Sequence, residues 1–118
     1  MIILLVGFIF AYSTEIELFN RLFTIFFQKN IIKIYTKKYK TLSKNLKIVN
    51  SCKNADLVLG NLKCNKPRFL LDYYSFKNDK EAIGAFYWRK GRPQLRLRKE
   101  KLKKYNLYVS KNFEDYLE

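Results

Sequence analysis

Residues 31–49, IIKIYTKKYKTLSKNLKIV, contain the pattern that decides the fold class. The apolar runs at 31–35 and 46–49 are typical of short strands. Between them, residues 37–44 fit a short surface helix whose Tyr39 faces inward. A strand–helix–strand unit of this kind predicts that its two strands pair in parallel.

The chain just upstream of this unit predicts a helix. Apolar residues recur at helical spacing through residues 16–27, which makes one broad apolar face. Thr14 followed by Glu17 forms a capping box at the expected start of the helix. The many Phe residues on this face indicate that the helix packs against a sheet.

Downstream, residues 55–59 and 68–74 predict two more strands, the second with contiguous apolar residues typical of a sheet interior. Residues 82–98 form the clearest hairpin, with a turn at residues 89–92 and a return strand that alternates strictly. Short helices are expected over residues 99–105 and 110–117, the second with Ser110 as its N-cap.

Together these elements predict one α/β domain over residues 14–118. We expect three layers, with a mixed, mostly parallel sheet, a hairpin in the C-terminal half and short flanking helices. The size of the chain, 118 residues, fits a single core.

The first thirteen residues predict a secretory signal peptide. Residues 1–10, MIILLVGFIF, are an apolar run too short for a spanning helix. Ala11 and Ser13 then place small residues at the −3 and −1 positions of a cleavage site before Thr14. No Lys or Arg precedes the run, and the alternative is that residues 1–10 form a buried N-terminal strand. Export predicts a periplasmic or secreted location for the domain that follows.

The chain has a net charge of +14, from 24 Lys and Arg against 10 Asp and Glu. Such a charge favours anionic neighbours, namely lipid headgroups, nucleic acid or an acidic protein face. Most of the cations are Lys, so a Lys-rich solvated surface is an equally good explanation. Nucleic acid is not expected as a partner, because an exported protein seldom meets it and no nucleic-acid-binding motif is present.

The sequence holds few residues suited to catalysis. It has no His, which removes the usual general base and the commonest metal ligand. Asp56, Asp72 and Asp79 fall near predicted strand ends, where ligands often bind in open α/β sheets, but no spacing pairs them for acid–base work. No phosphate-binding loop or nucleophile motif occurs either. We therefore expect no enzyme activity, no metal and no cofactor.

Cys52 and Cys64 are the two cysteines of the chain. In an oxidising compartment, a disulfide between them would close a loop around the strand predicted at 55–59. On the chain-entropy model such a loop contributes about 3 kcal/mol. The alternative is a pair of reduced, unlinked thiols, and export favours the disulfide.

The hairpin carries the candidate binding residues. Between Arg89 and Lys104 the chain has nine Lys and Arg and a single acid. Arg96 and Arg98 share one face of the return strand, with Tyr87 expected nearby, an arrangement suited to gripping phosphate. Because aromatic residues and Arg dominate interface hot spots, the candidate partner-binding residues are Phe86, Tyr87, Trp88, Arg89, Arg92, Arg96 and Arg98.

The order of these features resembles the YfiR-like family of small exported bacterial regulators. The family begins with a helix rich in Phe and Leu, here residues 16–27, and continues with a strand of the type seen in residues 31–35. Residues 52–60, CKNADLVLG, are similar to the family segment with Cys, an Ala-Asp pair and a later Gly. An Ile-Gly step at residues 83–86 and a closing segment over residues 105–117 extend the resemblance over most of residues 15–118.

The resemblance implies a periplasmic protein without an active site that binds the extracytoplasmic part of an inner-membrane signalling protein. In the family this partner is typically a diguanylate cyclase, so the output is cyclic-di-GMP, and disulfides tie redox state to activity. The residues themselves leave an alternative, a binding module that uses Arg96 and Arg98 to bind a small anionic solute or a polyanion. Its affinity should fall as the salt concentration rises.

Overall fold

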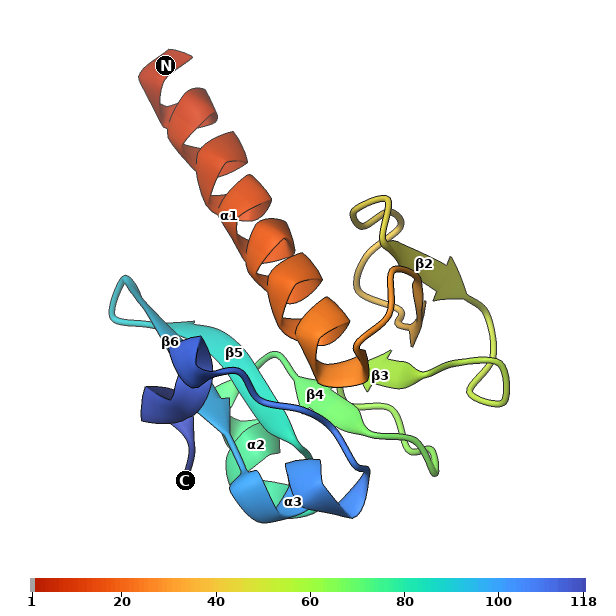
Figure 1. The fold of residues 1–118 in the computed structure, drawn as a ribbon. Helices are drawn as coiled ribbons and strands as arrows, with labels where there is room; N and C mark the ends of the chain where they lie inside the picture. The colour runs from red at the N-terminus through yellow and green to blue at the C-terminus, as the bar shows by residue number, and fades with distance from the viewer. Residues whose placement is uncertain (1) are drawn as a thin grey trace.

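The computed structural model describes the backbone of residues 2–118 and the side chains of residues 14–118. A six-stranded sheet forms its centre, in the strand order β2-β1-β3-β4-β5-β6 (Figure 1). Neighbouring strands are parallel except β5 and β6, which are antiparallel. The strands are β1 (Ile32–Tyr35), β2 (Leu46–Val49), β3 (Leu57–Leu59), β4 (Arg68–Leu70), β5 (Gly84–Arg89) and β6 (Arg92–Leu97). The predicted single α/β domain with a mostly parallel sheet is confirmed.

Helices cover both faces of this sheet. On one face, α1 packs together with Leu102 of α3 and Phe113 of η1 in a single apolar cluster. On the other face, Phe76 of α2 packs with Ala85 and Tyr87 in a separate cluster. The elements are α1 (Ile2–Phe27), α2 (Tyr73–Asn78), α3 (Lys99–Lys104) and the 3-10 helix η1 (Lys111–Tyr116). The domain therefore has the three layers that the sequence predicts.

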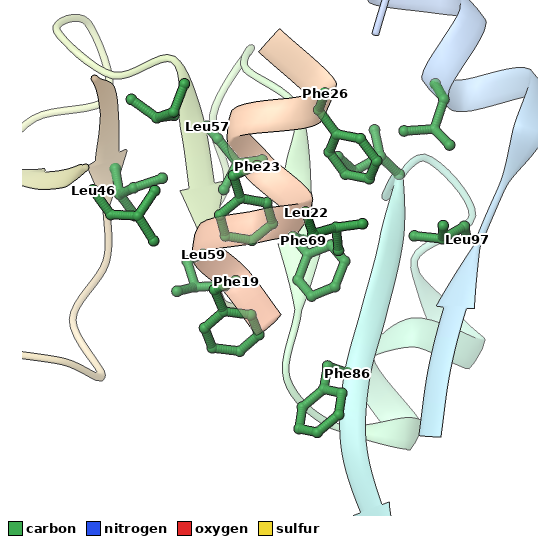
Figure 2. Packing of buried hydrophobic residues seen from close by; sticks show 14 of the residues in the cluster. Phe19, Leu22, Phe23, Phe26, Leu46, Leu57, Leu59, Phe69, Phe86 and Leu97 are labelled. Atoms are coloured by element: carbon green, nitrogen blue, oxygen red, sulfur yellow. The ribbon is translucent and has the colours of Figure 1, made fainter. Parts of the chain in front are cut away.

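The main core lies between α1 and the middle strands, as Figure 2 shows. Phe19 and Phe23 of α1 are fully buried and stack at 5.6 Å between ring centroids. Both meet the ring of Phe69 on β4 edge to face, at 6.0 and 5.2 Å. Burial of each such side chain contributes about 1.5–3 kcal/mol, so the helical spacing of Phe residues positions α1 across the sheet.

The N-terminal part of α1 corrects one expectation. The helix begins at Ile2, not at Thr14, and passes without a break through the predicted cleavage site. The alternative of an N-terminal strand over residues 1–10 is wrong for residues 2–10, which are helical. The side chains of the predicted signal peptide lie outside the described residues, so its cleavage stays a prediction.

The expected surface helix over residues 37–44 is also wrong, because this connection is an irregular loop. The strands it joins are parallel as predicted, but residues 36–45 leave too little chain for a helix and two turns. Side chains fix the loop instead. Tyr39 is buried and donates a hydrogen bond from Oη to Glu15 Oε1 at 2.8 Å, and Ser43 bonds Asn20 of α1 at 2.6 Å.

The region after β4 differs from the expected long strand. β4 ends at Leu70, and α2 begins at Tyr73, because the Asp72 carboxylate accepts a hydrogen bond from the backbone N–H of Ser75 at 2.9 Å and so caps the helix. At the C-terminus the predicted helix over residues 110–117 is a 3-10 helix. Ser110 stands at its N-cap position, but its side chain makes no cap hydrogen bond.

The predicted hairpin is confirmed as β5 and β6. Its two-residue turn is Lys90-Gly91, with φ of 52° and 76°, which is the geometry that favours a tight hairpin. Gly84 opens β5 where a Cβ would lie only 2.5 Å from the carbonyl oxygen of Arg96. A larger residue there would push the two strands apart.

Candidate functional site

Five parallel strands, β1 to β5, end at the same side of the sheet, which we call the carboxyl edge. The loop after β1, the Gly60-Asn61 turn and the β5–β6 hairpin turn all lie there. The chain reverses between Phe27 and Ile32, so α1 runs opposite to β1. The hydrogen bond from Tyr39 to Glu15 accordingly places the turn of α1 that contains Glu15 at this edge.

The candidate aromatic residues of β5 divide between the two faces of the sheet. Phe86 lies on the α1 face, where its ring meets Phe19 at 5.9 Å, and it is 5% exposed. Trp88 lies next along the same face, in edge contact with Phe86 at 6.0 Å, and is 48% exposed. Trp88 is therefore the aromatic candidate of β5 that offers a free surface, and Phe86 supports it from the core.

Tyr87 points to the other face and meets Arg96 of β6, as the sequence predicts. The Tyr87 hydroxyl accepts a hydrogen bond from Arg96 Nη1 at 3.2 Å. The same guanidinium forms a bidentate ion pair with Glu118, and this hydrogen bonding raises the pKa of Arg96 above its ordinary value. Arg96 thus binds the C-terminal residue of its own chain.

Arg98 is held even more firmly by the chain itself. Its guanidinium donates hydrogen bonds to the carbonyl oxygens of Phe76, Asp79 and Ala82, at 2.7 Å for Phe76 and 3.1 Å for Ala82. It also stacks on the Phe76 ring, 3.9 Å from the centroid, and burial lowers the pKa of Arg98. Arg98 closes the C-terminal end of α2, where helix carbonyls need donors, and a ligand would have to compete with these contacts.

Arg89 and Arg92 stand opposite each other at the hairpin tip, with Lys90 in the turn between them. All three are exposed. Arg89 contacts the ring of Tyr73 at 4.9 Å, but none of the three forms an ion pair with any acid among residues 14–118. These cations remain available to a partner.

The structure adds three lysines that the sequence analysis left as solvated surface. Lys37, Lys38 and Lys40 follow β1 at the carboxyl edge, are exposed, and pair with no acid within the described chain. The available signal was the KKYK run directly after a strand, since ligands of open α/β sheets bind outside the carboxyl ends of strands. The expected helix obscured that signal.

Two neighbouring cavities lie beside these lysines, and the first of them also reaches β5 of the hairpin. One, of about 540 Å³, lies between Glu15, Lys38, Lys40 and the aromatic side chains of Phe86 and Trp88. The other, of about 320 Å³, extends from Lys37 to Asn61 and Asp72, and the two share Lys38 and Leu71. The carboxyl edge is therefore a grooved surface lined by lysines, by aromatic and apolar side chains, and by the acids Glu15 and Asp72.

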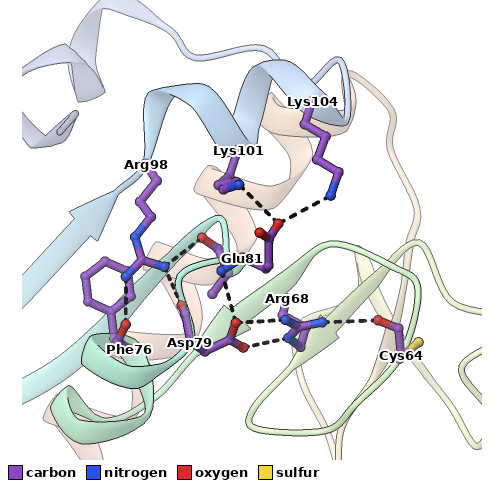
Figure 3. Close-up of polar contacts among 9 residues, drawn as sticks. Cys64, Arg68, Phe76, Asp79, Glu81, Arg98, Lys101 and Lys104 are labelled. Carbon is purple, nitrogen blue, oxygen red and sulfur yellow. Dashed lines mark hydrogen bonds and ion pairs between the residues drawn. The ribbon is translucent and has the colours of Figure 1, made fainter.

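The opposite side of the sheet, which we call the amino edge, has paired charges (Figure 3). Arg68 and Asp79 form a bidentate pair with both distances at 2.8 Å, and this hydrogen bonding lowers the pKa of Asp79. Hydrogen bonds from Lys101 and Lys104 likewise lower the pKa of Glu81. Asp56 accepts from Lys29. Of the three aspartates near predicted strand ends, only Asp72 lies at the carboxyl edge, where it caps α2.

Cys52 and Cys64 form the predicted disulfide, with Cα atoms 6.1 Å apart. It ties the loop before β3 to the loop after it. The carbonyl oxygen of Cys64 accepts a hydrogen bond from Arg68 at 3.2 Å, which connects the crosslink to the amino-edge ion pairs. A disulfide of this kind persists in oxidising compartments and so fits an extracytoplasmic location.

No three His, Cys, Asp or Glu side chains among the described residues gather closely enough to hold a metal ion. Within the same part of the chain, no helix combines the length and apolar character needed to cross a membrane.

Comparison with known proteins adds no relative. No protein-family model, curated protein or solved structure matches this chain. The resemblance to the YfiR-like family stays an expectation from the sequence, and the function has to be argued from the geometry of this chain.

Proposed function

We propose that this chain is an exported regulatory protein without enzyme activity that binds an acidic surface on the extracytoplasmic part of a membrane signalling protein. Such a protein works by binding one conformation of its partner better than another, which shifts the partner's equilibrium. The diguanylate cyclases controlled by the YfiR-like family are the kind of partner that we expect.

The observation that carries the proposal is the exposed aromatic residue beside unpaired cations at the hairpin. Trp88 is 48% exposed, while Phe86 behind it is buried against α1. Arg89 and Arg92 follow it at the hairpin tip, on the other face of the two strands, without an acid partner in residues 14–118. A rigidly supported Trp flanked by Arg is the composition of an interface hot spot, and its charge complements an acidic partner.

The disulfide supports the location that this function requires. A crosslink between Cys52 and Cys64 is expected in the periplasm or outside the cell and rare in the cytosol. It holds the loops around β3, at a distance from the hairpin in the sequence, so the domain presents the hairpin from a stabilised scaffold.

The alternative of anion binding through Arg96 and Arg98 has weaker support. Arg96 is engaged by Glu118 and Tyr87, and Arg98 by three carbonyl oxygens and the Phe76 ring. A ligand would have to displace these contacts. Their positions on one strand face, which motivated the alternative, serve the packing of α2 and the C-terminus.

Site-specific photo-crosslinking in the native host tests the proposal. A benzoylphenylalanine at position 88 should form an adduct with an inner-membrane protein that has an extracytoplasmic domain, because position 88 lies in the proposed contact. The same amino acid at Tyr108 is the matched control, since Tyr108 is also an exposed aromatic residue (52%) but lies beside the end of α1 at the amino edge. Mass spectrometry of the adduct identifies the partner.

Two results would contradict the proposal. One is the absence of any membrane-protein adduct from position 88 when the protein is present at its natural level. The other is an equal yield of the same adduct from positions 88 and 108, which would mean that the contact has no preference for the hairpin.

A further inference from the structure

We infer that the carboxyl edge is a membrane-facing surface that binds the anionic headgroups of phospholipids. This goes beyond the proposed function, since it assigns a lipid partner to Lys37, Lys38, Lys40 and Lys90, and to Trp88, Arg89 and Arg92, which the proposed protein contact also uses. The surface consists of Lys37, Lys38 and Lys40 on the loop after β1, Trp88 at the end of β5, and Arg89, Lys90 and Arg92 at the hairpin tip.

The first argument is the charge left unpaired at this edge. The acids beside these cations are Glu15 and Asp72, and both are engaged. Glu15 accepts a hydrogen bond from Tyr39, and Asp72 caps α2. The five ion pairs found among residues 14–118 all involve residues near the starts of the parallel strands, α3 or the C-terminus. The six cations of this surface therefore form no ion pair with any acid among residues 14–118.

The second argument is the position of the N-terminal part of α1. The helix continues from the carboxyl edge toward Ile2 and extends beyond the sheet (Figure 1). Residues 2–10 of the sequence are apolar throughout, so the segment suited to enter a bilayer during export joins the domain at this edge. A basic cluster next to such a segment is the arrangement that binds anionic lipid surfaces.

Trp88 gives the third argument. A half-exposed Trp with its ring supported by Phe86 is amphipathic, and Trp side chains favour the interface between headgroups and hydrocarbon. Pro93 lies opposite Trp88 across the hairpin and extends the apolar patch. Arg89 and Arg92 next to it place cations at the depth where headgroup phosphates lie.

The spread of the cations favours a bilayer over a small soluble anion. Lys37 and Lys40 line different cavities, with Lys38 shared between them, and Arg89 and Arg92 occupy the hairpin tip. A small anion needs donors that converge on one point. A lipid surface presents many phosphates and can engage all of these cations together.

Vesicle binding by the full chain tests the inference. Binding to vesicles with about 30% phosphatidylglycerol is compared with binding to pure phosphatidylcholine, so the apolar segment contributes to both and the ratio isolates the charge. Each Lys near an anionic surface contributes roughly fivefold. The triple variant Lys37→Gln, Lys38→Gln and Lys40→Gln should therefore lower the preference for anionic vesicles by at least about tenfold.

The matched control replaces three exposed amino-edge lysines, Lys80→Gln, Lys99→Gln and Lys103→Gln. It changes the net charge equally and should retain most of the preference. An equal loss in both triple variants would overturn the inference, since attraction would then follow net charge alone. Loss of the preference of the unmodified chain in millimolar glycerol phosphate would also overturn it, because the site would then take a free anion.

Trp88 supplies an independent readout, because it is the single Trp of the chain. On anionic vesicles its emission should shift to the blue and be quenched by doxyl-labelled lipid. Unchanged quenching by aqueous acrylamide on the same vesicles would overturn the inference. These vesicles contain no protein, so failure here leaves the crosslinking test of the proposed function unaffected.

Discussion

The two edges of the sheet carry the same kind of residues in opposite situations. At the amino edge, Arg68 binds Asp79 in bidentate geometry, Arg98 binds three carbonyl oxygens, and Arg96 binds the C-terminal Glu118. At the carboxyl edge, Lys37 and Arg89 have no acid partner among the described residues. The 24 Lys and Arg of the chain therefore include two groups, cations that bind groups of the domain itself and cations that are available to a partner.

The difference between the edges indicates which cations stabilise the fold and which can bind a partner. An Arg whose guanidinium is hydrogen-bonded within its own chain contributes to stability, and a ligand would have to compete with those contacts. An exposed Lys without a partner contributes little to stability and can bind at no structural cost. Substitutions at the two edges should therefore differ in their effect on the free energy of unfolding.

Removal of the disulfide should have the largest effect. Replacing Cys52 and Cys64 together with Ser should lower the free energy of unfolding by about 3 kcal/mol, because the unfolded chain loses a constraint on its loop. Urea unfolding followed by circular dichroism measures the loss. The reductant dithiothreitol should destabilise the natural chain by a similar amount and leave the double variant unchanged. Equal stability of the two chains would contradict the prediction.

The substitution Arg98→Met should cost about 2 to 3 kcal/mol, since hydrogen bonds to a charged group are lost and carbonyls at the end of α2 are left without a donor. Arg89→Met at the hairpin tip is the matched control. It removes one contact with the Tyr73 ring and should cost less than about 1 kcal/mol. Urea unfolding of both variants measures the contrast. Similar losses of unfolding free energy in the two variants would mean that Arg98 and Arg89 contribute equally to stability, which contradicts the prediction.

The hairpin and the helix over residues 16–27 could be predicted because local patterns determine them. The turn at Lys90-Gly91 needs positive φ, and the Phe residues of α1 recur at the helical period. The role of Arg98 could not be predicted in this way. Alternation along β6 predicts that Arg98 and Arg96 share one face of the strand. The carbonyl oxygens that Arg98 binds, however, come from α2 and from the segment after α2.

Two elements were predicted wrongly, one because of contacts with distant residues and one because a local cap was missed. The loop over residues 36–45 has helix-compatible residues, yet the bonds from Tyr39 to Glu15 and from Ser43 to Asn20 hold it as a loop. The start of α2 at Tyr73 depended on reading Asp72 as a cap rather than as an exposed strand position. The lysines after β1 became a candidate site only when the fold placed them beside the hairpin.

Measurements at acid pH should show how much Asp79 contributes to the free energy of unfolding. Hydrogen bonding to Arg68 lowers the folded-state pKa of Asp79 below its unfolded value, so the stabilisation is present above about pH 4 and is lost as the pH falls through the folded-state pKa. Asp79→Asn should cost about 1 to 2 kcal/mol at neutral pH and should flatten this acid limb. Unfolding midpoints across the acid range measure the effect. A parallel acid limb in both proteins would contradict it.

The smallest effect should come from the carboxyl-edge lysines. The triple variant Lys37→Gln, Lys38→Gln and Lys40→Gln should change the free energy of unfolding by less than about 0.5 kcal/mol. Because removal of three like charges relieves repulsion, any change should be a gain that is larger at low salt than at high salt. Replacing Lys101 and Lys104 with Gln is the contrast, since it removes both partners of Glu81 and any salt-dependent change should be a loss. A gain in one variant and a loss in the other, measured by urea unfolding at two salt concentrations, would show that the same residue type has opposite roles at the two edges.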